Sequence, residues 1–210
     1  MLEYLSYLGV AVFAVSGAIS AGRKKLDLVA VVLVAAVTAL GGGTLRDLIL
    51  DVQPILWVGD TTYLWIAFGA ASATMVWQRR ISRIEPALVY ADAAGLALFS
   101  VLATQRALLA GADDIVAVVM GIVTSIVGGI LRDVLCGDPP LVMRGEVYAT
   151  CSLVGSLLFL GIVEFGGPVD VALIVGALGA FGLRLAAIRL SLRMPLFTWS
   201  DTPPRGPPSE

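Results

Sequence analysis

Apolar runs long enough to cross a bilayer follow one another along almost the whole chain. The hydrocarbon core of a bilayer is about 30 Å thick, and a helix needs about 20 apolar residues to span it. The runs predict seven membrane-spanning helices, at 2–21, 28–50, 62–78, 86–105, 114–135, 146–165 and 169–190. We therefore predict an all-α multi-pass membrane protein with a single transmembrane domain over residues 1–190.

The composition excludes several classes of function. Hydrophobic residues make up 58% of the 210 residues and charged residues 14%, whereas a soluble domain averages about 45–50% and about 25%. A net charge of −2 offers no basic surface for nucleic acid, and the chain has no histidine. Cys136 and Cys151 lack the spacing of a zinc or disulfide motif. We expect no enzymatic activity, no cofactor, no tightly bound metal and no nucleic-acid partner.

Basic residues mark alternate loops between the predicted spans, and Lys and Arg are enriched in cytoplasmic loops. They gather in the first, third and fifth loops and after the last span, at Arg23, Lys24, Lys25, Arg79, Arg80, Arg83, Arg144, Arg189, Arg193 and Arg205. The even-numbered loops carry only Arg106. We therefore predict a protein of the cell (inner) membrane with its N-terminus outside, its C-terminus in the cytoplasm and a disordered cytoplasmic tail at 191–210.

The sequence also repeats itself at an offset of 86 residues, from the first predicted span to the end of the sixth. The motif GGGTLRD at 41–47 aligns with VGGILRD at 127–133. Each unit, at 1–78 and 86–165, holds three predicted spans, so the second copy must enter the membrane from the opposite side. We predict two inverted three-helix repeats plus a seventh helix, an architecture in which transporters carry their solute at the repeat interface.

Glycines fall inside the second and fifth predicted spans. A glycine in a helix interior costs about 0.8–1.0 kcal/mol relative to alanine. We expect these glycines to kink or break the two helices beside a water-filled path, because freed backbone groups need water or protein partners. The residues concerned are Gly41, Gly42, Gly43, Gly128 and Gly129. Close helix packing is the alternative, and it is the role expected of Gly69, Gly155, Gly176 and Gly179.

An Arg-Asp pair follows each glycine element inside the span, where unpaired charges are costly. Asp47 and Asp133 are expected at the start of a second half-helix, whose N-terminus favours a carboxylate. Because adjacent residues on a helix point in different directions, we predict ion pairs across the repeats, Arg46 with Asp133 and Arg132 with Asp47. These groups can form a buried structural network, contact a solute directly, or do both.

Two further charges lie inside predicted spans. Asp92 is expected to line the path, the alternative being a position at the membrane interface, and Ser6 occupies the same place in the first repeat. Arg184 lies near the predicted cytoplasmic end of the last span, and we expect its guanidinium to extend to the membrane surface.

Five segments carry a resemblance to a known family: KKLDL at 24–28, TALGGGTLRDLIL at 38–50, DAAGLALFSVLATQRAL at 92–108, GGILRDVLCGDPPLV at 128–142 and EVYATCSLVGSLL at 146–158. The chain resembles the bacterial and archaeal branch of the trimeric intracellular cation channels, long catalogued as an uncharacterised or glycine-transporter membrane family. The resemblance implies a homotrimer with a separate hydrophilic pore through each protomer, bent second and fifth helices at that pore, and passive conduction of monovalent cations.

We therefore predict a passive channel for K⁺ or Na⁺ in contact with membrane lipid. Its expected pathway residues are Gly41, Gly42, Gly43, Arg46, Asp47, Asp92, Gly128, Gly129, Arg132 and Asp133. A secondary transporter of a small solute such as glycine is the alternative, because half-helix N-termini and buried arginines would suit a carboxylate.

Overall fold

The computed structural model describes residues 1–81, 87–144 and 147–194, and within these ranges the chain is built from α-helices. The long and medium-length helices are α1 (Leu2–Arg23), α2 (Leu28–Ile49), α4 (Thr62–Val76), α6 (Ala87–Leu109), α7 (Asp114–Leu135), α8 (Ala149–Glu164) and α9 (Val169–Arg189). Short helices α3 (Leu56–Gly59), α5 (Gln78–Ile81) and η1 (Leu141–Met143) lie in the connections. Most of the tail predicted to be disordered, 195–210, lies outside the described residues.

Five of these helices, α1, α2, α6, α7 and α9, are long and apolar enough to cross a membrane. α4 and α8 are apolar as well but shorter, with 15 and 16 residues. The chain is thus an all-α integral membrane protein, as predicted. The predicted bounds differ most at α6, which continues to Leu109 rather than ending at 105, and this extension places Arg106 within the helix.

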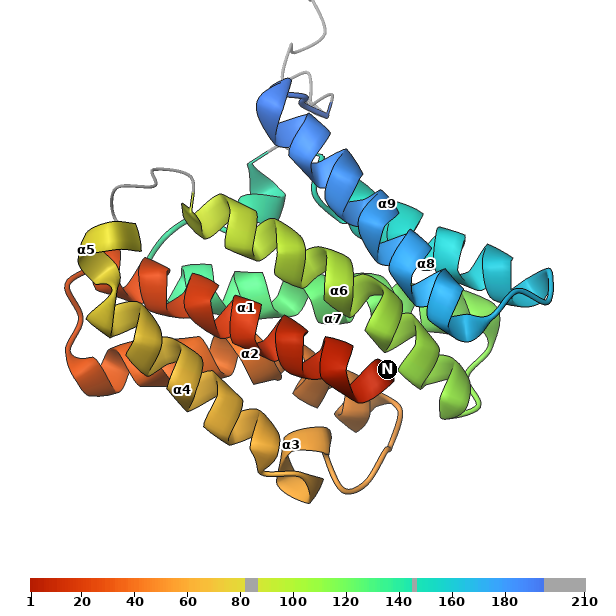
Figure 1. Cartoon of the computed structure of the whole chain (residues 1–210), viewed down its shortest axis with the longest axis horizontal. Helices are drawn as coiled ribbons and strands as arrows, with labels where there is room; N and C mark the ends of the chain where they lie inside the picture. The colour runs from red at the N-terminus through yellow and green to blue at the C-terminus, as the bar shows by residue number, and fades with distance from the viewer. Residues whose placement is uncertain (82–86, 145–146, 195–210) are drawn as a thin grey trace, which may run out of the picture.

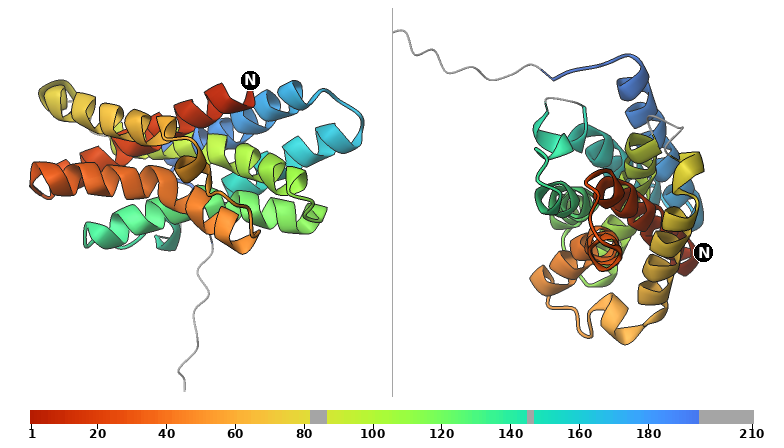
Figure 2. Two further views of the ribbon diagram at one scale, coloured as in Figure 1. Left: turned by 90° about the horizontal axis from the view of Figure 1, so that it is seen from below. Right: turned by 90° about the vertical axis from the view of Figure 1, so that its left-hand side faces the viewer.

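The helices form one bundle in which α1 and α6 pack against each other near the centre (Figure 1). α4 lies beside α1 and α2, whereas α8 and α9 lie side by side and pack on α6. α2 and α7 also pack together. The turned views show the long helices running roughly along the long axis of the molecule (Figure 2). Large apolar side chains cover the outside, including Leu33, Trp65 and Leu178, as expected of a surface that faces lipid.

Helices that align in the sequence, α1 with α6 and α2 with α7, end in the same way. After α6 and α7, Gly111 and Gly137 adopt φ values of 83° and 69°. Lys25 and Asp51 hold the matching places after α1 and α2, with φ values of 58° and 52°. At each end the following residue donates its backbone N–H to a carbonyl five positions back, as Leu26 does to Ala21. This is the common left-handed helix terminus, for which glycine is the usual residue.

The first helices of the two halves contact each other reciprocally. The rings of Phe13 on α1 and Phe99 on α6 stack with centroids 5.3 Å apart and an interplanar angle of 10°. Each ring lies against a glycine of the opposite helix, Phe13 against Gly95 and Phe99 against Gly9. The aligned positions 13 and 99, and 9 and 95, therefore make matching contacts in the two halves.

Glycines elsewhere have the packing role expected of them at three of the four positions. A methyl group on Gly155, Gly176 or Gly179 would come within 3.0 Å of an atom of a neighbouring helix, so each allows close approach. Gly69 is the exception, because no atom lies within 4 Å of the position of its missing side chain. The packing prediction for Gly69 is therefore wrong within this protomer.

Candidate functional site

The site is built where α2 and α7 cross, and two glycines set the distance between these helices. A methyl group on Gly42 would lie closer than 3.0 Å to the backbone carbonyl oxygen of Thr124 on α7. On Gly128 it would lie equally close to the carbonyl oxygen of Thr38 on α2. The crossing is thus reciprocal, and each helix places a glycine against the other's backbone.

The two helices are not broken at their glycines. α2 runs without interruption from Leu28 to Ile49, and α7 from Asp114 to Leu135. A kink at these glycines stays a prediction, whereas the alternative of a complete break is wrong. The physical reason is that close contact between the helices compensates for the low helix propensity of glycine.

The remaining glycines of the motif have different surroundings. Gly41 faces the Leu131 side chain, whereas the nearest atom to a methyl group on Gly43 would be a guanidinium nitrogen of Arg46 at 4.0 Å. A methyl group on Gly129 would lie 3.0 Å from the hydroxyl of Tyr148 and 3.2 Å from a carboxylate oxygen of Asp92. Gly43 and Gly129 thus leave room for charged or polar groups, and Gly42 and Gly128 do not.

The arginines pair with their own neighbours and not across the repeats. The Arg46 Nε donates to Oδ1 of Asp47 at 2.9 Å, and the Arg132 Nε donates to Oδ1 of Asp133 at 2.8 Å. The predicted cross-repeat pairs are therefore wrong. Although adjacent side chains leave a helix in different directions, the long arginine stem can turn its guanidinium back onto the neighbouring carboxylate.

Each carboxylate also holds the segment that follows its helix. The second oxygen of Asp47 accepts the backbone N–H of Leu56 at 3.0 Å, and that of Asp133 accepts the N–H of Leu141 at 2.9 Å. Both aspartates lie in the last turn of a continuous helix, where the helix dipole disfavours a negative charge. The prediction that they begin a second half-helix is wrong, and the arginine and the backbone N–H supply the compensating interactions.

Arg132 is the centre of a fully enclosed network. Its Nη1 donates to Asp92 at 2.7 Å and to the Ser16 hydroxyl at 2.6 Å, in addition to the contact with Asp133. The side chains of Arg132 and Asp92 have 0% exposure. Asp92 therefore lies inside the bundle and not on its outer surface. Arg132, Asp92, Asp133 and Ser16 are called the α7 network below.

A second buried arginine adjoins this network. Arg184 of α9 is fully buried, stacks over the ring of Tyr148 with its guanidinium 4.8 Å from the centroid, and donates to the Val147 carbonyl at 3.1 Å. The expectation that Arg184 extends to the membrane surface is wrong. A cation–π contact and a backbone carbonyl replace the water that the guanidinium would otherwise need.

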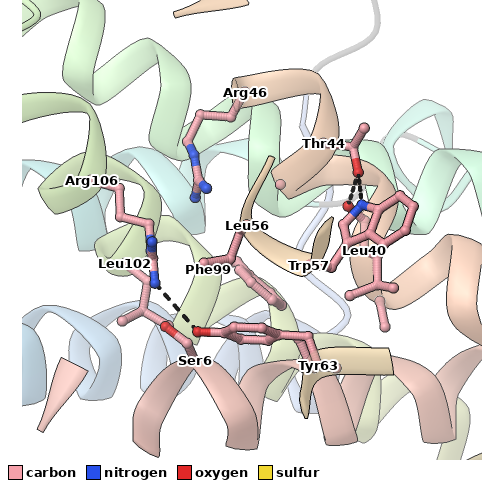
Figure 3. Close-up of a pocket in the computed structure, with 13 residues that line it drawn as sticks. Ser6, Leu40, Thr44, Arg46, Leu56, Trp57, Tyr63, Phe99, Leu102 and Arg106 are labelled. Atoms are coloured by element: carbon pink, nitrogen blue, oxygen red, sulfur yellow. Dashed lines mark hydrogen bonds between the residues drawn. The ribbon is translucent and has the colours of Figure 1, made fainter. Parts of the chain in front are cut away.

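The matching place at the end of α2 is hollow (Figure 3). A cavity lined by residues of α1, α2, α3, α4 and α6, including Ser6, Gly43, Arg46, Tyr63 and Arg106, is called the α2 cavity below. The space that the centre of a water molecule can reach in it is about 20 Å³, enough for water. A wider hollow of about 250 Å³ adjoins it and shares Arg46 and Arg106 among its lining residues.

Sequence reasoning missed Arg106 as a site residue. It lies within α6 with its guanidinium directed into the α2 cavity, where its Nη2 donates to the Tyr63 hydroxyl at 3.4 Å (Figure 3). Ending the predicted span at 105 placed this residue in a loop. A further apolar turn lies between Arg106 and Asp113, and this turn indicates in the sequence that the helix continues past residue 105.

No group of His, Cys, Asp and Glu side chains within the described ranges could hold a metal ion. The polar groups here are ion pairs, hydroxyls and backbone N–H groups beside water-sized space. Such an arrangement can hold or pass a small hydrated solute.

Comparison with known proteins identifies the family. The family model described as Glycine transporter matches the chain twice, at residues 3–79 and 89–164. The crystal structure of the trimeric intracellular cation channel (TRIC) orthologue from Rhodobacter sphaeroides is 39% identical, covers 91% of this chain and 98% of its own, and superposes with a TM-score of 0.88. The chain belongs to the TRIC family.

Other TRIC structures and bacterial relatives agree with this assignment. A structure described as the basis for conductance through TRIC cation channels is 34% identical, with a TM-score of 0.85 and coverage of 95% of this chain and 98% of its own. The UPF0126 inner membrane protein YadS of Escherichia coli is 38% identical over 96% of this chain and 98% of its own length. A UPF0126 membrane protein of Vibrio cholerae is 40% identical over 94% and 83%.

Proposed function

We propose that this chain is a passive channel for monovalent cations, K⁺ or Na⁺, with a path through each protomer. The observation that carries the proposal is its close likeness to TRIC cation channels over more than nine-tenths of its length. The water-sized α2 cavity beside buried charges supports a hydrophilic path in the same place.

The proposed path passes the crossing of α2 and α7. At the α2 end, Gly43 and Arg46 line the α2 cavity and Asp47 lines the adjoining hollow, and at the α7 end Gly129 adjoins the enclosed α7 network. Gly41, Gly42 and Gly128 contribute by allowing the helices to cross closely. Opening the α7 end then requires the Arg132 contacts with Asp92 and Ser16 to rearrange, so this conformation is closed there.

We propose further that α1, α2 and α4 form one repeat and α6, α7 and α8 an inverted second one, with α9 as a seventh span. The reciprocal glycine contacts and the two matches of one family model support this duplication. The repeats at 1–78 and 86–165, with the helix at 169–190, then form one transmembrane domain. Its basic loops place the N-terminus outside and the C-terminus in the cytoplasm of the cell membrane.

A carrier for a small zwitterion such as glycine is the second candidate. Two guanidinium groups, those of Arg46 and Arg106, line the α2 cavity and would suit a carboxylate. A carrier and a channel differ in kinetics. The transport rate of a carrier saturates as the solute concentration rises, whereas the ion current through a channel follows the membrane voltage directly.

Recording from the purified protein in a planar bilayer tests the channel. Under a KCl gradient we expect stepwise currents whose reversal potential lies near that of K⁺, since the path selects cations. A reversal potential that follows chloride would contradict the proposal. Saturable glycine uptake without such currents would favour the carrier instead.

We also propose that the protein is a homotrimer, because its TRIC relative from Rhodobacter sphaeroides is named as a trimeric channel. Native mass spectrometry in mild detergent should show three copies of the 21.9 kDa chain as the main species. A dominant monomer or dimer, stable across detergents, would count against this assembly.

A further inference from the structure

The α2 cavity contains a charge that the α7 network lacks. Arg106 is partly buried in α6, and its one hydrogen bond to another side chain among the described residues is the long one to the Tyr63 hydroxyl. It makes no ion pair within that part of the chain. Its guanidinium lines both the α2 cavity and the adjoining hollow, together with that of Arg46.

The two ends of the proposed path differ in their net charge. Around the α2 cavity there are two guanidinium groups and one carboxylate, that of Asp47. In the α7 network Arg132 contacts two carboxylates, those of Asp92 and Asp133. Even with Arg184 counted, that end has as many carboxylates as guanidinium groups, whereas the α2 end has one positive charge in excess.

Two substitutions between the repeats produce this excess. Ser6 stands where the second repeat has Asp92, and its hydroxyl donates to the Leu2 carbonyl of its own helix. Arg106 stands where the first repeat has Ser20. Two further carboxylates, those of Glu3 and Asp60, lie near Tyr63 but line neither hollow, and Asp60 already accepts hydrogen bonds from Tyr7 and the Thr62 backbone.

We propose that Arg106 is the residue that restricts cation passage through the α2 half of the path, by placing an uncompensated positive charge in it. This inference rests on the proposed channel function. A positive charge in a narrow cavity bounded by apolar walls repels a cation strongly, and rings of basic side chains favour anions in pores. The competing role for Arg106 is structural, as a hydrogen-bond donor that fixes Tyr63.

Three variants separate these roles. Arg106→Gln removes the charge, Arg106→Lys keeps it, and Tyr63→Phe removes only the hydrogen bond. With about 0.1 M KCl, where the screening length is about 10 Å, we expect Arg106→Gln to raise single-channel K⁺ conductance on the order of tenfold. Arg106→Lys and Tyr63→Phe should each raise the conductance by much less than Arg106→Gln does. The gain should shrink at about 1 M KCl, where the screening length is about 3 Å.

Ser6→Asp supplies the carboxylate that the second repeat has, and offers an independent measurement if Arg106→Gln folds poorly. Its conductance should rise as well, and by clearly more than that of the uncharged control Ser6→Asn. If Arg106→Gln and Ser6→Asp both conducted K⁺ at the wild-type level, this inference would be overturned, whereas the channel function would stand. An equal gain in Tyr63→Phe would also overturn it, in favour of the structural role. Absence of K⁺ current from every variant would overturn the channel and the inference together.

Discussion

Alanine at Gly42 or at Gly128 should sharply reduce the yield and thermal stability of the folded protein. Either methyl group would enter the backbone of the opposite helix, at the carbonyl of Thr124 or of Thr38. Backbone cannot move aside as a flexible side chain can, so α2 and α7 would have to separate. Overpacking of this kind costs about 1–3 kcal/mol or more. Thermal melting followed by size-exclusion chromatography in detergent measures the effect.

Gly43→Ala is the matched control, because it lies in the same motif and its methyl group would come no closer than 4.0 Å to another group, the Arg46 guanidinium. Its folded yield should equal or exceed that of the wild type, since alanine raises helix propensity by about 0.8–1.0 kcal/mol. If Gly42→Ala and Gly43→Ala melted alike, close crossing would not be what the motif provides. K⁺ conductance of the stable Gly43→Ala protein would then show whether helix flexibility matters for the path.

The glycine motif illustrates what the sequence could and could not predict. A run of three glycines both weakens a helix and lets another helix approach, and these two effects leave the same pattern in one chain. Which effect dominates depends on what lies opposite Gly42. That partner, Thr124, is 82 positions away and is placed only by the folded bundle.

The order and extent of the apolar helices could be predicted well, because burial in lipid leaves a strong signal along the chain. The predicted span 114–135 coincides with α7. Charged residues inside helices were predicted poorly. Arg106 and Arg184 were assigned to a loop and to the membrane surface by their nearness to span ends. Their contacts, the Tyr63 hydroxyl and the Tyr148 ring, come from distant parts of the chain.

The ion pairs were predicted wrongly for a related reason. The free-energy cost of an unpaired charge inside a membrane correctly indicates that the charges of the two Arg-Asp pairs need partners. Which partners they find depends on side-chain reach, and the arginine stem is long enough to pair with an adjacent carboxylate. The two halves then differ: Arg46 has one carboxylate partner, whereas Arg132 has two and a serine hydroxyl.

Arg132→Gln should therefore be among the most damaging single substitutions. It leaves Asp92 fully buried without its cation, and removing one partner of a buried pair costs about 3–5 kcal/mol. For a chain of this size we expect the melting temperature to fall by roughly 10 °C or more. Arg144→Gln is the control and should melt as the wild type, because Arg144 is exposed and, among the described residues, donates to the Pro139 carbonyl at the surface.

The double variant Asp92→Asn/Arg132→Gln distinguishes a true pair from two separately important residues. If the two charges need each other, removing both should destabilise the protein by less than the sum of the single changes, since no orphan charge remains between them. Asp133 still bonds the Leu141 N–H in that variant, so the connection after α7 stays anchored. Strict additivity of the two melting shifts would mean that Asp92 and Arg132 each find water or backbone, and that the α7 end of the path is hydrated rather than closed.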